Sequence, residues 1–179
     1  MAKKARGVID NNDTTGEGPD AIELLESQHR AVEKLFQDLK NASEQKEMRA
    51  VVLQIVDQLT AHATIEERHF YPAVRTDDTE DLIEDAFDDH REVKEMCLHL
   101  MEVGTSDEDF HAKVEELQAL VEEHVVIEES ELFPQVRELL DVEQLVTIGR
   151  QMTATMAELE EIGEPRQQLV SELSNGAPK

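Results

Sequence analysis

Six residues that can bind a metal ion recur at regular spacing along the chain. Four are histidines and two are glutamates: His29, His62, Glu66, His90, His124 and Glu128. Each glutamate follows a histidine by four residues, which places both side chains on one face of an α-helix, one turn apart. Imidazole and carboxylate groups together form a donor set suited to divalent or trivalent metal ions.

These residues belong to an internal duplication. Residues 62–72 match 124–134 at an offset of 62 (124 minus 62), and residues 29–32 match 90–93 at an offset of 61 (90 minus 29). We therefore expect two copies of one helical hairpin, packed about a pseudo-twofold axis. Such packing would bring two half-sites face to face and make one paired site.

The spacing of apolar residues predicts the elements that position this site. Alternating steps of three and four predict helices over about 20–41, 45–74, 79–103 and 107–140. Asp20, with Glu23 three residues later, predicts a capping box at the first start. The fold class expected is all-α: an antiparallel up-down four-helix bundle, each buried face carrying a histidine at one level. A further periodic segment, about 142–162, predicts an additional C-terminal helix on the outside of the bundle.

The composition of the chain suggests four parts. The first residues are rich in Asn, Asp, Thr and Gly and have little to bury, which is typical of disorder. The expected parts are a disordered N-terminal arm (1–19), the bundle (20–140), an accessory helix (141–163) and a flexible C-terminal tail (164–179).

The two glutamates on the predicted buried faces require a compensating charge. Burying Glu66 and Glu128 without partners would cost several kcal/mol each, or would force protonation. No basic residue lies on these faces. Two metal ions would supply the missing charge.

The donors divide naturally between two ions, although the sequence also allows a crossed pairing. In one arrangement both carboxylates bridge and each copy supplies two imidazoles to one ion: His29 with His62, His90 with His124, and Glu66 and Glu128 between them. Each ion then has fewer protein donors than an octahedral shell needs. An oxo or hydroxo bridge, water, or a ligand such as O₂ or peroxide would fill the open positions. The absence of thiolates favours iron over manganese or zinc.

The order and spacing of these ligands resemble the hemerythrin-like family, the HHE cation-binding domain, over about residues 20–140. Ile-Glu-Glu and aromatic-Pro pairs within both paired motifs, and Leu35-Phe36 after the first histidine, extend the resemblance. It implies an oxo- or hydroxo-bridged non-haem di-iron centre that binds O₂ or reacts with hydrogen peroxide or NO. The chain departs from the oxygen-carrying members, since Lys94 stands where they have a second histidine and Glu128 replaces a His-and-Asp arrangement. These departures favour redox turnover or sensing over reversible O₂ carriage.

Two functions of different classes follow from this interpretation. One is an enzyme that reduces or dismutes peroxide, like a catalase, in a response to oxidative stress. The other is a binding, storage or sensing protein for O₂, NO or iron that does not turn over. A structural bundle with zinc or with no metal is a further alternative, and the sequence does not decide whether the protein is an enzyme.

Residues next to the predicted ligands have both a functional and a structural interpretation. His69, one turn past Glu66, is either an additional group that supports the site or a half-exposed residue near the mouth of the bundle. Glu67 and Glu129 project off the buried face and are expected to be solvated or salt-bridged.

Three further residues lie near the site along the chain. Cys97 is either a redox thiol or, as we favour, a small buried hydrophobic residue. Tyr71 and Phe133 are matched positions roughly opposite the ligand face, where we expect them to serve in packing, although a tyrosine within reach of iron would matter.

The charge of the chain limits its partners. Acidic residues number 42 against 17 basic ones, for a net charge of −25, which repels phosphate backbones and anionic lipids. We therefore expect no nucleic acid or membrane partner, and the sequence identifies no protein partner or reductant. A single cysteine and the lack of a secretory signal or long apolar run favour a cytoplasmic location.

Overall fold

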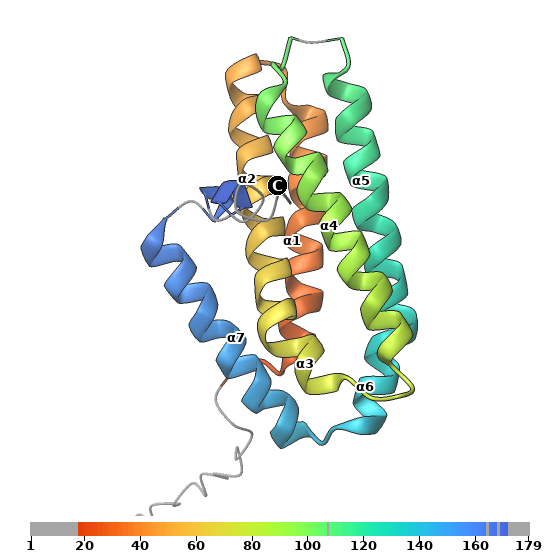
Figure 1. The fold of residues 1–179 in the computed structure, drawn as a ribbon. Helices are drawn as coiled ribbons and strands as arrows, with labels where there is room; N and C mark the ends of the chain where they lie inside the picture. The colour runs from red at the N-terminus through yellow and green to blue at the C-terminus, as the bar shows by residue number, and fades with distance from the viewer. Residues whose placement is uncertain (1–17, 107, 164, 168, 172–179) are drawn as a thin grey trace, which may run out of the picture.

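The chain folds into an antiparallel four-helix bundle with an additional helix on one side (Figure 1). The computed structural model describes residues 18–106, 108–163, 165–167 and 169–171. The helices of the bundle are α1 (Ala21–Asn41), α2 (Gln45–Ile65), α4 (Glu80–Glu102) and α5 (Phe110–Ile127). The predicted all-α fold class is confirmed. Across these described ranges, no helix is both long and apolar enough to cross a membrane.

Both second helices of the duplication are interrupted in the same way. Each runs into a π-helical turn and then a short α-helix: η1 (Glu66–Phe70) and α3 (Tyr71–Val74), then η2 (Glu128–Leu132) and α6 (Phe133–Leu139). Pro72 and Pro134 follow these turns. A proline has no N–H and its ring clashes with the carbonyl group four residues back, so a regular α-helix does not continue through it. The prediction of uninterrupted helices was therefore wrong at this point, and α5 also begins later than predicted.

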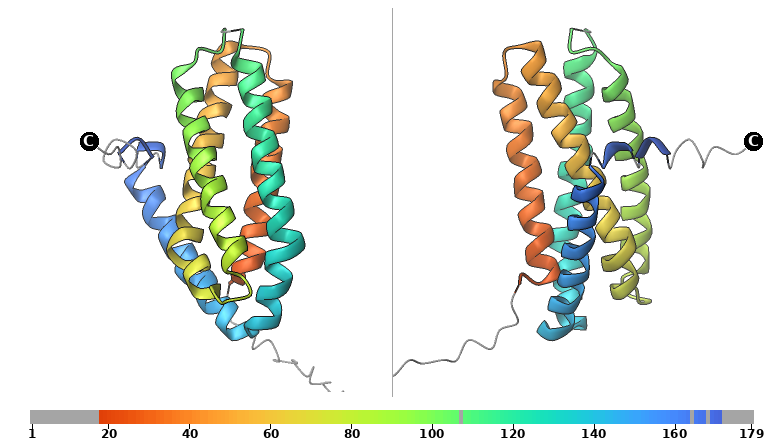
Figure 2. Two further views of the ribbon diagram at one scale, coloured as in Figure 1. Left: turned by 45° about the vertical axis from the view of Figure 1, so that its right-hand side comes forward. Right: turned by 90° about the vertical axis from the view of Figure 1, so that its left-hand side faces the viewer.

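The additional helix α7 (Val142–Ile162) lies on the outside of the bundle, as predicted. It packs against α1, α2 and η1, on the side of the bundle away from α5 (Figure 2). The predicted capping box of α1 is present, because the Glu23 N–H donates to Asp20 Oδ1 at 2.8 Å and the Asp20 N–H donates to Glu23 Oε2 at 3.1 Å. Asp141 and Gln144 form the same device at the start of α7.

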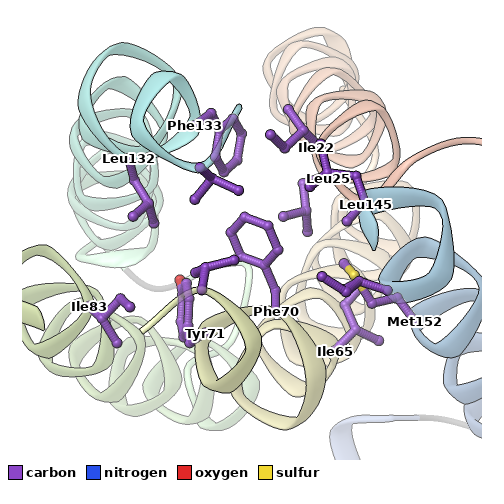
Figure 3. Packing of buried hydrophobic residues seen from close by; sticks show 14 of the residues in the cluster. Ile22, Leu25, Ile65, Phe70, Tyr71, Ile83, Leu132, Phe133, Leu145 and Met152 are labelled. Carbon is purple, nitrogen blue, oxygen red and sulfur yellow. The ribbon is translucent and has the colours of Figure 1, made fainter. Parts of the chain in front are cut away.

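Two apolar clusters lie along the bundle, one on each side of the level that carries the histidines. The first gathers side chains from both hairpins and from α7, among them Ile22, Leu25, Ile65, Phe70, Leu132 and Met152 (Figure 3). The second includes Phe36, Ile55, Leu100, Phe110 and Leu117. Any polar group between these clusters is shielded from bulk water and needs a partner inside the protein.

Part of the predicted flexible tail packs against the bundle. Leu169 is fully buried and joins the second cluster. The Arg166 N–H donates to Asp57 Oδ1 of α2 at 3.0 Å, and its guanidinium pairs with the same carboxylate. The apolar side chain and the ion pair explain why this stretch is fixed. Residues 172–179, and residues 1–17 of the predicted arm, lie outside the described part of the chain.

Gly149 of α7 lies so close to the start of α1 that a side chain does not fit. A Cβ atom there would lie 2.6 Å from the Pro19 carbonyl oxygen and 3.0 Å from the Ala21 nitrogen, both backbone atoms. We expect Gly149→Ala to lower the free energy of unfolding by about 1–3 kcal/mol, measured by urea denaturation. Gly104→Ala is the control, because its Cβ would meet only Ser106 Oγ at 3.8 Å. Equal stabilities of the two variants would contradict this account of the packing.

Candidate metal centre

The bundle brings all six predicted ligands together at one level. Each of the four bundle helices contributes one histidine, and each π-helical turn begins with one glutamate. All six are buried, and Glu66 and Glu128 are only 0% and 1% exposed. Their potential ligand atoms form two overlapping groups, in each of which all atoms lie within 4.8 Å of one another: His29, His62, Glu66 and Glu128; and Glu66, His90 and His124.

Each carboxylate lies between histidines of both copies. Glu66 Oε2 is 3.1 Å from His62 Nε2 and 3.2 Å from His90 Nε2. Glu128 Oε2 is 3.4 Å from His29 Nε2 and 3.5 Å from His124 Nε2. The imidazoles themselves are closest within each hairpin, with ring centroids 4.9 Å apart for His29 and His62 and 4.8 Å apart for His90 and His124. This geometry favours one pair of histidines from each hairpin, with the carboxylates between the pairs.

The Nδ1 atom of each histidine faces a hydrogen-bond acceptor. The four acceptors are Glu129 for His29 at 2.8 Å, Gln28 for His62 at 2.8 Å, Glu67 for His90 at 3.0 Å and Asp89 for His124 at 3.3 Å. Because carboxylate and amide oxygens accept, Nδ1 carries the proton and the lone pair lies on Nε2. All four Nε2 atoms point into the cluster. Supporting acceptors of this kind fix the orientation and tautomer of metal-binding histidines.

The four residues that accept hydrogen bonds from the histidines also occupy matched positions in the two copies. Gln28 and Asp89 directly precede the first histidine of each copy and hold the second one in the same hairpin. Glu67 and Glu129 directly follow the two predicted glutamate ligands, and each holds a histidine of the opposite hairpin.

Glu67 and Glu129 have a second role besides the predicted salt bridges. Their predicted salt bridges are present, because Lys94 Nζ lies 2.8 Å from Glu67 Oε1 and Arg30 pairs with Glu129. Their hydrogen bonds to imidazoles were missed. The recurrence of a Glu-Glu pair in both copies was the available signal, but the partner lies on another helix and spacing does not show it.

The cluster contains buried polar atoms that lack partners. Within the described residues, six buried side-chain atoms have no hydrogen-bond partner: His29 Nε2, His62 Nε2, His124 Nε2, both carboxylate oxygens of Glu66, and Glu128 Oε2. Each unsatisfied group costs about 1–3 kcal/mol. All six atoms are electron-pair donors that face one another, so bound cations would satisfy them together. The residues therefore fit a metal centre.

The pKa shifts of the buried groups in the cluster also favour bound cations. Burial, together with the charge of Glu128, raises the pKa of Glu66 well above its usual range. Burial also lowers the pKa of His62. Burial opposes ionisation of Glu128, yet its charge interactions with His124 and His29 lower its pKa. Without cations, the two carboxylates cannot both be ionised at low cost.

Tyr71 lies against the cluster, contrary to the prediction that it packs on the opposite side. The Tyr71 N–H bonds to the Glu66 carbonyl group five residues back, as in a π-helix, and the Phe133 N–H does the same to Glu128. In an α-helix a residue five positions on points about 140° away, whereas a π-helical turn brings it back to the same side. The Tyr71 hydroxyl donates to Glu128 Oε1 at 2.9 Å.

The pair formed by Tyr71 and Phe133 breaks the symmetry of the site. Phe133 has no hydroxyl and instead stacks on His29, with centroids 6.0 Å apart and planes at 4°. Both Glu66 oxygens therefore lack a hydrogen-bond partner, whereas one Glu128 oxygen is occupied. The two carboxylates are chemically different.

Two further candidates do not join the cluster. His69 turns outward, where its Nε2 lies 2.8 Å from Thr155 Oγ1 of α7, so it fastens α7 to η1 and does not support the ligands. Cys97 is 1% exposed, and burial raises the pKa of its thiol to about 12. At neutral pH it is a buried, protonated thiol, in line with the favoured prediction.

An apolar cavity of about 30 Å³ adjoins the four histidines. Its walls include Val32, Leu59, Val93, Cys97 and Val121, whereas neither Glu66 nor Glu128 lines it. One water molecule needs about 10–15 Å³ by the same measure. The cavity therefore has room for one or two small molecules beside the four histidines.

Comparisons with known proteins agree with this description. Residues 20–136 match the sequence profile of the family described as "Hemerythrin HHE cation binding domain". A protein of Nostoc sp. named "DNA nickase" is 28% identical over 139 residues, which make up 78% of this chain but only 40% of that protein. The crystal structure of a hemerythrin HHE cation binding domain-containing protein from Mycobacterium kansasii has a similar fold, with a TM-score of 0.71. That alignment covers 89% of this chain and 95% of the other at 22% identity.

Proposed function

Since the chain belongs to the hemerythrin HHE cation-binding domain family, we propose that it holds two iron ions and reacts with O₂, hydrogen peroxide or NO. The proposed ligands are His29, His62, Glu66, His90, His124 and Glu128. One observation carries the proposal: the buried side-chain atoms without partners in the described part of the chain all belong to these residues and face one another. We assign no catalytic residue beyond the ligands.

The side chains around the ligands prepare the site for metal and for a small ligand. Iron, when bound, supplies open coordination positions and changes of oxidation state. Glu67 and Glu129 keep two imidazoles in the tautomer that presents Nε2, and their own charges are balanced by Lys94 and Arg30. The apolar clusters above and below exclude bulk water. The apolar cavity leaves space for the small ligand next to the imidazoles.

We favour redox chemistry with peroxide, of a catalase-like kind, or sensing of such species in a response to oxidative stress. Lys94, which occupies the place of an additional histidine in the oxygen carriers, binds Glu67 and borders the cavity. Fewer imidazoles leave more coordination positions for exogenous ligands. The alternative is reversible binding, storage or sensing of O₂, NO or iron without turnover.

Metal content and a spectrum test the proposal directly. Protein purified from iron-replete medium is expected to contain two irons per chain and to absorb in the near ultraviolet through charge transfer from bridging oxygen to iron. Added peroxide should then release O₂ over many turnovers. Stoichiometric bleaching without O₂ release would favour the binding alternative. Colourless protein with no iron after iron-replete growth would overturn the proposed centre.

Tyr71→Phe is expected to make the two halves of the site more alike. The variant removes the hydroxyl that donates to Glu128 but keeps the ring, and phenylalanine already occupies the matched position 133. We expect near-normal iron content and about tenfold slower reaction with peroxide, since a hydrogen bond to a charged group contributes about 1.5–3 kcal/mol. Mössbauer spectra of the wild type should show two kinds of iron, which converge in the variant. Phe133→Tyr is the reciprocal variant, and unchanged spectra in both would show that Tyr71 does not distinguish the irons.

We do not extend DNA nicking to this chain. The Nostoc protein that carries the name is much longer, and the net charge of −25 would repel DNA phosphates. Supercoiled plasmid incubated with the iron-loaded protein is expected to stay supercoiled. Conversion to open circles at catalytic protein concentrations would contradict this expectation. The single, buried cysteine suits a reducing compartment, and we propose the cytoplasm.

A further inference from the structure

A groove on the surface borders the cavity at the centre of the bundle. The groove lies between α1 and α5, has a volume of about 300 Å³ and is lined by Arg30, Glu33, Phe36, Glu122 and Val126, among others. It shares His29, Val121 and Val125 with the inner cavity. These three side chains therefore form the wall between the groove and the cavity.

The duplication provides an internal comparison for this side of the bundle. Val126 on α5 is 62% exposed, whereas the matched Thr64 on α2 is 7% exposed. Val125 is half-buried, whereas the matched Ala63 is buried. On the first hairpin, α7 packs on α1, α2 and η1, on the side away from α5 (Figures 1 and 2), and Arg166 pairs with Asp57 of α2. Val126 of α5 stays exposed beside the groove between α1 and α5.

The backbones of α1 and α5 approach each other at fewer points than those of the other neighbouring helix pairs, which are α1 and α2, α2 and α4, and α4 and α5. At the lower end of the groove, Arg30 binds Glu129, which in turn accepts the hydrogen bond from His29 Nδ1. Glu129 and Arg30 thus hold His29 in place. Val121 and Val125 are held by apolar packing.

The rim of the groove disfavours anions. Arg30 is neutralised by its ion pairs with Glu33 and Glu129, and Glu122 adds an exposed negative charge. Beyond the rim, the groove is lined by valines, Phe36 and the ring of His29. A small uncharged molecule crosses such a passage without losing strong hydration, whereas an anion meets both a repulsive field and an apolar wall.

We propose that small uncharged molecules enter the centre through this groove, passing Val126 at the surface and the wall of Val121 and Val125. This inference rests on the proposed function and names its substrate class as neutral molecules of the size of NO, O₂ or hydrogen peroxide. Val121, Val125 and Val126 thereby determine which molecules reach the irons and how fast. These three side chains line the passage and do not contact the reacting atoms.

A matched pair of tryptophan variants tests the route. Val126→Trp fills the groove, whereas Val142→Trp places the same ring at an equally exposed valine on α7, away from it; the wild-type exposures are 62% and 69%. We expect Val126→Trp to slow the bimolecular reaction of the iron-loaded protein with NO about tenfold. Val142→Trp should leave this rate unchanged, and both variants should keep two irons. Equal rates in the two variants would overturn the route.

A second readout is independent of iron. Cys97 is the single thiol of the chain and lines the inner cavity, so it reports the arrival of a small thiol reagent. In metal-free protein at alkaline pH, methyl methanethiosulfonate should convert Cys97 to its methyl disulfide more slowly in Val126→Trp than in Val142→Trp. Val125→Ala, which thins the wall, should speed the labelling. Equal labelling rates in all three variants would contradict the route even if the iron chemistry proved correct, whereas absent iron with altered labelling would contradict only the proposed function.

Salt tests the expected charge preference. The rate with uncharged NO should not depend on ionic strength, whereas the rate with azide anion should rise as salt screens the acidic surface. An azide rate that falls with added salt would show an attractive passage and overturn the assignment to neutral molecules.

Discussion

Glu66→Ala is expected to leave about one iron or less per chain, against the two proposed for the wild type, and to abolish the proposed reaction with peroxide. Glu66 is the residue that both potential ligand groups have in common. Its Oε2 lies 3.1 Å from His62 Nε2 and 3.2 Å from His90 Nε2, so the variant removes a donor from both positions at once. Both of its oxygens lack other partners. Iron analysis together with the near-ultraviolet spectrum measures the effect.

Glu128→Ala should disturb the site less than Glu66→Ala, so the two variants can be compared directly. Glu128 belongs to one of the two groups, its Oε2 lies farther from the imidazoles, at 3.4 and 3.5 Å, and its Oε1 is held by Tyr71. We expect it to retain more iron than Glu66→Ala. Glu131→Ala is the control, since this exposed glutamate lies on the same π-helical turn as Glu128 and should keep two irons. Full iron content in Glu66→Ala would show that the ligand assignment is wrong.

Removal of iron should destabilise the protein strongly. The metal-free centre keeps two buried carboxylates and several imidazoles without compensation, and a buried charge that loses its partner costs about 3–5 kcal/mol. For a chain of this size the loss corresponds to a fall in Tm of about 6–20 °C. Calorimetry before and after chelation, and after iron is restored, measures it. An unchanged Tm on chelation, with iron loss verified, would contradict the account.

Glu66→Ala is a control for the loss of stability on iron removal, because it should raise the stability of the metal-free protein. In the metal-free state the variant lacks the buried carboxylate, so it should be more stable than the metal-free wild type, although less stable than the iron-loaded one. Added iron should raise the Tm of the wild type and barely change that of the variant. A variant less stable than the metal-free wild type would show that the carboxylate stabilises the fold by itself.

The pH dependence of this difference follows from the raised pKa of Glu66. Burial and the charge of Glu128 raise this pKa, so the folded metal-free protein binds a proton at Glu66 more tightly than the unfolded chain. The resulting stability is fully present below the ordinary carboxyl pKa and is lost as pH rises through the raised value. Relative to metal-free Glu66→Ala, metal-free wild type should therefore lose stability as pH rises from about 4 to 8. Urea unfolding of both proteins across this range measures the difference.

The sequence by itself predicted the helices and the residues that meet at the centre. The spacing of apolar residues along each helix is a local property, and it places His29, His62, His90 and His124 on buried faces wherever the helices pack. The duplication then predicts that these faces meet. The capping box at Asp20 and the outer helix over 142–162 are equally local, and both are present.

Only the tertiary structure decided how the site is supported and how it is reached. The hydrogen bond from His29 to Glu129 joins residues 100 positions apart, on different hairpins, and no spacing rule contains it. Tyr71 reaches Glu128 because a π-helical turn changes the periodicity that the prediction had assumed. Val126 is exposed and the matched Thr64 is buried, a difference that depends on how the rest of the chain packs on each hairpin. Residues of one helix share a face by local geometry, whereas these three features depend on the register and packing of elements that are distant in the chain.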